Sequence, residues 1–217
     1  MKVYTKTGDK GSSSLYDGGR VGKNCILFNV LGELDELSSR IGMLCALIPD
    51  TKEYYLHLDE QMRVFFREDK FMRKIQSNIQ DINSVIATID PVKSALYQIT
   101  SHDVKDLETW IDHMETFNTK LTQFVLPGSI MVDAQAQLCR TQTRKVERYL
   151  WELHHSVEMI EKANKSSEPV SDDCIDLGKI KIDDNLFAYI NRLSDFFFVM
   201  ARYLGFVQKA EEHFYQK

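Results

Sequence analysis

The sequence predicts an all-α fold, a bundle of some five substantial helices behind a glycine-rich N-terminal loop. In several long segments, apolar residues recur at three- and four-residue steps, whereas few segments have the alternation of strands and none repeats. Hydrophobic residues make up 43% of the chain and charged residues 27%, as in ordinary globular proteins. We expect one domain over residues 1–217, with the loop at 1–25 and the bundle at 26–217.

The N-terminal stretch "TKTGDKGSSSLYDGGR", Thr5 to Arg20, is rich in glycine, serine and cations. Its turn composition favours a loop over a pair of strands. Backbone N–H groups of a glycine-rich turn, together with lysine and hydroxyl donors, can form a site for an anion. The spacing is not that of a Walker A loop, and no buried strand precedes it, so the stretch alone is a weak motif.

The first helix is predicted from Ile26 to Ile48, before Pro49 and Asp50. Its apolar side is clear: Leu27, Val30, Leu34, Leu37, Ile41, Leu44 and Ile48. The opposite side is unusually small: Leu31, Asp35, Ser39, Gly42 and Ala46. This side is either a second contact within the chain, with Asp35 as a surface charge, or the place where another subunit brings a cation to Asp35.

The middle of the chain predicts two further helices, one that ends in a turn at Asp90 and Pro91 and one from Ser101 to Phe117 with Ser101 as its N-cap. An irregular lead-in, Thr51 to Lys74, precedes the first of them. Its arginines and phenylalanines alternate with acids, which favours a solvated helix over a nucleic-acid surface: Arg63, Phe65, Phe66, Arg67 and Phe71 with Asp59, Glu60, Glu68 and Asp69.

A long fourth helix is predicted from Met131 to about Ile160, after the break "LPGS". One ridge of it carries Arg140, Arg144, Glu147 and Trp151, with Arg148 beside them. Such a ridge is either a solvated face or a place where guanidinium groups bind phosphate oxygens.

The final helix is predicted from about Asp184 to Phe214, and it is mostly aromatic and aliphatic. Asn191, Asp195 and Arg202 form a narrow polar stripe on it. Polar groups in such surroundings need partners, so the stripe is either a buried structural network or one wall of a polar site.

Composition narrows the classes of function. A net charge of -5 disfavours a nucleic-acid-binding protein, and no apolar run reaches the roughly 20 residues that cross a bilayer. The four cysteines, Cys25, Cys45, Cys139 and Cys174, have neither metal spacing nor a disulfide pattern, so we expect reduced thiols. A cytoplasmic protein is the default expectation, or a mitochondrial one if a presequence has been removed.

Six segments together resemble the PduO-type ATP:cob(I)alamin adenosyltransferases, in order and roughly in spacing. They are "YTKTGDKGSSSL", "GELDELSSRIG", "LETWID", "FVLPGS", "CRTQTRKVER" and "NRLSDFFFVMARY". The resemblance covers most of the chain apart from Thr51 to about Ser101. It implies a homotrimer of five-helix bundles, with ATP and cobalamin bound between neighbouring subunits.

The resemblance also implies residue roles. Asp35 and Arg140 match a salt bridge across the subunit boundary, and with Arg144 they are the candidate catalytic residues. Phe124 matches the aromatic residue that closes the lower face of the corrin. The matching ATP contacts are Thr5, Lys6, Thr7, Gly8, Ser13, Ser14, Lys23, Arg144, Glu147, Arg148 and Asn191. We name no metal-binding residue.

The implied reaction transfers the 5′-deoxyadenosyl group of ATP to the cobalt of cob(I)alamin, so it needs no protein nucleophile. Lysines, arginines and Mg²⁺ would neutralise the triphosphate, while a separate reductase and an adenosylcobalamin-dependent enzyme would be transient partners. Three positions depart from the family pattern: Ser129 replaces a glycine, Gln137 a histidine and Lys145 an arginine. They keep open an alternative from another class, a nucleotide- or cobalamin-binding chaperone or sensor without turnover.

Overall fold

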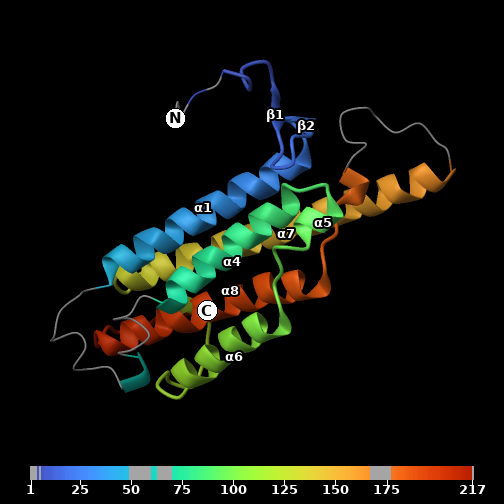
Figure 1. Ribbon diagram of the computed structural model, residues 1–217. Coiled ribbons are helices and arrows are strands. Elements are labelled where there is room, and N and C mark those ends of the chain that lie inside the picture. The colour runs from blue at the N-terminus through green and yellow to red at the C-terminus, as the bar shows by residue number, and fades with distance from the viewer. Residues whose placement is uncertain (1–3, 5, 49–59, 63–69, 167–176, 217) are drawn as a thin grey trace.

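The computed structural model describes residues 4, 6–48, 60–62, 70–166 and 177–216. Five of its helices have 15 residues or more and lie side by side as a bundle (Figure 1). They are α1 (Ile26–Leu47), α4 (Lys70–Ile86), α6 (Ser101–Glu115), α7 (Met131–Ser166) and α8 (Asp184–Val207), with a short α5 (Pro91–Ser94) after α4. The predicted helical fold class is confirmed, with only two-stranded sheets in the described part.

The core lies where α1 and α8 pack against α7, with α4 against α1 and α6 against α8. Of the predicted apolar side of α1, all residues but the half-buried Ile48 are buried. From α8 come four of the largest fully buried side chains: Tyr189, Phe196, Phe197 and Tyr203. None of the described helices has the length and apolar character that a membrane crossing requires.

The N-terminal stretch contains a strand pair, so the prediction of a loop without one was wrong. Strand β1 (Ser12–Ser14) pairs antiparallel with β2 (Arg20–Gly22) at the end of the bundle where α1 begins (Figure 1). Gly11 and Gly18 have φ values of 81° and 95°, a backbone conformation that favours glycine, on either side of β1. The same glycines that predicted a loop therefore allow the chain to fold back into a hairpin.

The N-cap of α6 lies one residue before the predicted cap, since Thr100 and not Ser101 caps the helix. The Thr100 hydroxyl accepts a hydrogen bond from Asp103 N, and the Asp103 carboxylate accepts one from Thr100 N, which forms a capping box. Lys74 of α4 lies 3.1 Å from the same carboxylate. Burial raises the pKa of Asp103, but the hydrogen bonds from Thr100 and Lys74 outweigh it and lower the pKa to about 2.

Helix α8 ends at Val207, well before the predicted end at Phe214. Lys209 adopts a φ of 55°, which turns the chain away from the helix axis. The chain then returns as β4 (His213–Phe214), antiparallel to β3 (Val125–Leu126). The apolar residues beyond Val207 therefore keep the helical spacing in the sequence, although the chain there is not helical.

Two other predictions meet the structure only in part. Among the described residues, Cys25, Cys45 and Cys139 form no disulfide, and burial raises the pKa of Cys139 to about 12, whereas Cys174 lies outside the described residues. Most of the lead-in, at 51–59 and 63–69, also lies outside them. Within its described end, Phe71 contacts Trp110 and Phe196, so this ring belongs to the bundle.

Candidate functional site

The hairpin β1–β2 is anchored to the end of α4 by the carboxylate of Asp17. Its Oδ2 accepts hydrogen bonds from Ile89 N at 2.8 Å and from Asp90 N at 2.9 Å. Burial raises the pKa of Asp17, but these backbone donors and Gly19 N outweigh it, so the pKa lies below its ordinary value. Tyr16 N also donates to Ala87 O at 3.0 Å. The glycine-rich segment is thus held against the bundle at defined points.

Inside this segment, the side chain of Arg20 organises the backbone. Its Nη2 donates to Thr7 O at 3.0 Å, to Ser12 O at 3.3 Å and to Ser12 Oγ at 2.7 Å. Its Nη1 donates to Ser14 Oγ at 3.4 Å. One guanidinium therefore draws the turn at Thr7 onto strand β1, although sequence reasoning assigned Arg20 no role.

The predicted ATP-contacting residues of the N-terminus lie together in this hairpin and in the turn before it. Lys6 has a φ of 61°, Thr7 is exposed, and Ser13 and Ser14 lie in β1. The Lys23 ammonium crosses to the same turn, where a Cβ placed on Gly8 would lie 3.3 Å from Nζ. Thr5 lies outside the described residues. Residues with hydroxyl and ammonium groups thus lie close to the turn backbone in this segment.

The ridge of α7 meets α8 and forms a second polar surface. Asn191 Nδ2 donates to Glu147 Oε1 at 3.0 Å, which joins two predicted ATP contacts from different helices. Arg148 Nη1 donates to Arg144 O at 3.1 Å, and both arginines are exposed. At the end of the ridge, Trp151 stacks on a ring of α8, with centroids 4.0 Å apart. We name this set, Arg140, Arg144, Glu147, Arg148 and Asn191, the arginine ridge.

Lys145 points away from the arginine ridge, toward α1. Its Nζ lies 2.7 Å from Glu33 Oε1, and Gln142 Nε2 donates to Glu33 Oε2 at 2.6 Å. Burial raises the pKa of Glu33, but the hydrogen bonds from Lys145 and Gln142 outweigh it and lower the pKa. The lysine at this departure from the family pattern is therefore a contact between two helices of the bundle.

Asp35 and Arg140 do not pair within the chain; each has another neighbour. Asp35 is exposed on α1, and its Oδ1 accepts a hydrogen bond from Asn83 Nδ2 of α4 at 3.2 Å. Arg140 Nε donates to Gln137 Oε1 at 2.6 Å on its own helix. Burial, and then the positive charge of Arg144, lowers the pKa of Arg140. The surroundings of Arg140 therefore favour the approach of a negative charge.

Phe124 lies directly before β3 and has a relative exposure of 83%. Its backbone is fixed nevertheless, because Tyr215 N donates to Phe124 O at 2.8 Å beside the β3–β4 pair. The ring is therefore accessible to a ligand or to another subunit, although one exposed apolar side chain does not by itself mark a contact surface.

The "LPGS" turn connects β3 to α7. Asp133 accepts hydrogen bonds from Gly128 N, Ser129 N and Ile130 N at 3.2, 3.0 and 3.3 Å. Gly128 has a φ of 104°, which explains a glycine at this position. Ser129 enters the turn through its backbone N–H, which any residue but proline supplies. Its departure from the family pattern therefore leaves this turn intact.

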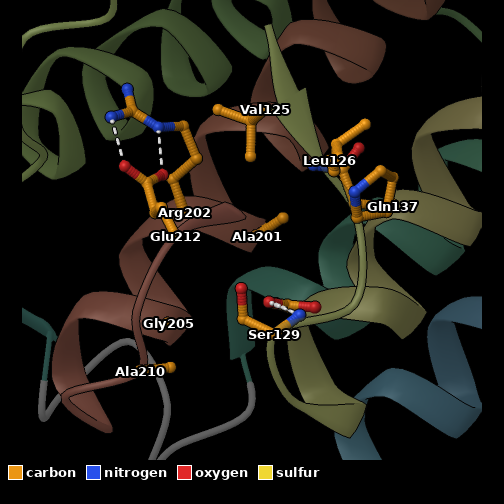
Figure 2. Close-up of a pocket in the computed structure, with 11 residues that line it drawn as sticks. Val125, Leu126, Ser129, Gln137, Ala201, Arg202, Gly205, Ala210 and Glu212 are labelled. Atoms are coloured by element: carbon orange, nitrogen blue, oxygen red, sulfur yellow. Dashed lines mark hydrogen bonds and ion pairs between the residues drawn. The ribbon is translucent and has the colours of Figure 1, made fainter. Parts of the chain in front are cut away.

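The polar stripe of α8 divides into separate contacts. Asn191 binds Glu147 of α7 within the arginine ridge, whereas Asp195 pairs with Arg192 on the same helix at 2.9 Å. Arg202 is buried and binds Glu212 after the helix, with Nε 2.7 Å from Oε1 (Figure 2). Of the two interpretations of the stripe, a structural network holds for Arg202 and a polar surface for Asn191.

Comparison with known proteins identifies the family. Residues 3–204 match the family model of the cobalamin adenosyltransferases. The chain is 31% identical to the human corrinoid adenosyltransferase MMAB over 100% of its own length and 74% of the relative's. It is also 31% identical to the corrinoid adenosyltransferase of Bacillus subtilis, over 93% of this chain and 86% of the relative.

Solved structures agree in fold. A variant PduO-type ATP:corrinoid adenosyltransferase from Lactobacillus reuteri, complexed with cobalamin and ATP, superposes with a TM-score of 0.75. The alignment covers 99% of this chain and 97% of that one, at 24% sequence identity. From the family match over nearly the whole length, and from the relatives in mammals and bacteria, the chain belongs to the cobalamin adenosyltransferase family.

Proposed function

We propose that the hairpin and the arginine ridge bind the triphosphate of ATP while this enzyme transfers the adenosyl group of ATP to a corrinoid. The family match carries the enzymatic assignment. The observation that carries the site is the Asn191–Glu147 hydrogen bond, which places a predicted contact of α8 beside Arg144 and Arg148 of α7. Guanidinium groups suit phosphate oxygens, which they can bind through two parallel hydrogen bonds.

The proposed site lies between subunits of a homotrimer of five-helix bundles. The hairpin is anchored through Asp17 to the turn between α4 and α5, whereas the arginine ridge joins α7 and α8, so the two polar surfaces belong to different parts of the bundle. Exposed apolar side chains also lie on α1 and α7, namely Met43, Met131 and Leu138. In the trimer these would be covered, and Asp35 of one subunit would pair with Arg140 of the next.

The chemistry needs positioning and charge neutralisation from the protein. The Co(I) lone pair attacks C5′ of the ribose, the C5′–O bond breaks, and triphosphate leaves with the bonding electrons. The product contains a Co(III)–carbon bond, so no protein group changes its covalent state. Lys23, Arg144 and the turn N–H groups would stabilise the charge that grows on the leaving triphosphate.

Mg²⁺ would enter with ATP as part of the substrate. Within the described residues, no three His, Cys, Asp or Glu side chains are grouped to hold a metal ion. Such a group is not required, because Mg²⁺ usually keeps several waters and binds through phosphates and one or two carboxylates.

Phe124 would close the lower face of the corrin. A hydrocarbon ring cannot coordinate cobalt, so it would favour a four-coordinate Co(II) that a separate reductase can reduce to Co(I). Its exposure and its fixed backbone support this role.

The decisive assay mixes the protein with ATP, Mg²⁺ and chemically reduced cob(I)alamin and follows the absorbance change to adenosylcobalamin. Adenosylcobalamin and triphosphate should appear in equal amounts. A protein that binds both substrates without forming either product would be the chaperone or sensor considered from the sequence, and would contradict the proposal.

A further inference from the structure

The segment that carries Phe124 is held by very little regular structure. Strands β3 and β4 have two residues each, paired as Val125 with Phe214 and Leu126 with His213. One more backbone hydrogen bond joins Tyr215 N to Phe124 O. A pair this short is not stable by itself in water, so other contacts must fix the position of the ring.

A buried guanidinium supplies those contacts. Arg202, with a side-chain exposure of 2%, places Nε 2.7 Å from Glu212 Oε1 and Nη2 3.1 Å from Glu212 Oε2, as Figure 2 shows. Nη2 also donates to Thr119 O at 2.7 Å and to Thr119 Oγ1 at 3.2 Å. Thr119 lies in the segment that leads to Phe124, and Glu212 directly precedes β4. One side chain of α8 therefore joins the two segments that form the β3–β4 pair.

The charges of this contact are matched. The hydrogen bond from Arg202 lowers the pKa of Glu212 and outweighs the opposite effect of burial, so the carboxylate is ionised at neutral pH. A two-point contact between guanidinium and carboxylate fixes direction as well as distance. Lysine would give a single ammonium that cannot bind both Glu212 oxygens and Thr119 in this planar arrangement. The adjoining hollow, with a volume of about 10 Å³, leaves room for roughly one water.

We propose that Arg202 is a positioning residue for the reaction: through Glu212 and Thr119 it holds Phe124 against the lower face of the corrin. This inference rests on the proposed role of Phe124. It predicts that weakening the Arg202–Glu212 contact impairs formation of four-coordinate Co(II) without impairing the binding of ATP.

The test compares Glu212→Gln and Arg202→Lys with Phe124→Ala. Asp195→Asn is the matched control, since Asp195 pairs with Arg192 on the same helix and lies about 10 Å along the axis from Arg202. Electron paramagnetic resonance of bound cob(II)alamin measures the four-coordinate fraction. Calorimetry measures the Kd for ATP, and turnover is measured from Co(II) with a reductant and from Co(I) supplied already reduced.

For Glu212→Gln we expect the ratio of four- to five-coordinate Co(II) to fall roughly tenfold, the scale of one lost charge-assisted hydrogen bond. The Kd for ATP and turnover from Co(I) should change by less than about twofold, and Asp195→Asn should leave the ratio unchanged. The double variant Phe124→Ala with Glu212→Gln should lose no more signal than Phe124→Ala alone, because both changes remove the same ring from the corrin.

The possible outcomes distinguish the positioning role of Arg202 from the proposed role of Phe124. If Phe124→Ala abolishes the four-coordinate signal while folded Glu212→Gln leaves it unchanged, the positioning role of Arg202 is wrong and the role of Phe124 stands. If Phe124→Ala itself keeps the signal, the proposed role of Phe124 fails. If Arg202→Lys does not fold, Glu212→Gln decides, because Glu212 is only half-buried.

Discussion

Replacing Arg144 by alanine tests most directly whether the arginine ridge binds triphosphate. The same substitution at the neighbouring Lys145 provides the control. Arg144 is exposed beside Glu147 and Arg148, whereas Lys145 faces α1 and pairs with Glu33 at 2.7 Å. A hydrogen bond between a charged side chain and a charged ligand contributes about 1.5 to 3 kcal/mol. At 1.36 kcal/mol per decade, Arg144→Ala should lower kcat/KM for ATP by roughly ten- to a hundredfold.

The two substitutions should affect different properties of the protein, activity in one case and thermal stability in the other. Arg144→Ala should keep the thermal stability of the protein, since an exposed side chain is removed. Lys145→Ala should keep most of the activity and lower the melting temperature slightly, because it leaves the half-buried Glu33 without its cation. Steady-state kinetics with ATP varied at saturating cob(I)alamin, together with thermal melts, measure both. Small and equal effects on kcat/KM would refute the assignment of the arginine ridge to triphosphate.

Three further predictions follow from other parts of the molecule. The protein should sediment as a trimer, and Asp35→Lys should shift it toward monomer; a wild-type monomer at micromolar concentration would exclude the site between subunits. Arg20→Ala should raise the Kd for ATP, measured by calorimetry, because the turn at Thr7 loses its contacts to β1. Asp103→Asn should lower the free energy of unfolding at pH 7 by about 1 to 2 kcal/mol. Because the folded pKa is about 2 against an ordinary 3.8, this contribution is present above pH 4 and is lost as the pH falls toward 2; denaturant titrations at both pH values measure it.

The helices of the bundle could be predicted because helical periodicity relates residues only three and four positions apart in the sequence. The buried side of α1 is the clearest case, since burial and three- and four-residue spacing agree there from Leu27 to Leu44. The end of α8 could not be predicted in this way. The stop is a Schellman turn, in which Lys209 N donates to Phe206 O and Ala210 N to Gly205 O, and Lys209 takes a positive φ where the sequence has no glycine to indicate it.

The candidate site was predictable to the extent that its residues follow family motifs. The arginine ridge and the serines of β1 fall into this group. Arg20 and Asp17 were missed for another reason: most of their partners are backbone groups, which no residue pattern displays. Asp17 binds backbone N–H groups, and Arg20 binds two backbone carbonyls besides two serine hydroxyls. Knowing where those backbone groups lie requires the three-dimensional structure.

The anchor of the hairpin has a consequence for the order in which the chain acquires its structure. Asp17 and its partner Ile89 are separated by 72 positions, although the carboxylate and the backbone N–H meet at 2.8 Å. During synthesis, the hairpin leaves the ribosome long before α4 exists, so its docking must wait until about ninety residues have emerged and α4 has packed on α1. The part of the protein that is made first therefore cannot reach its final position before about ninety of the 217 residues have emerged.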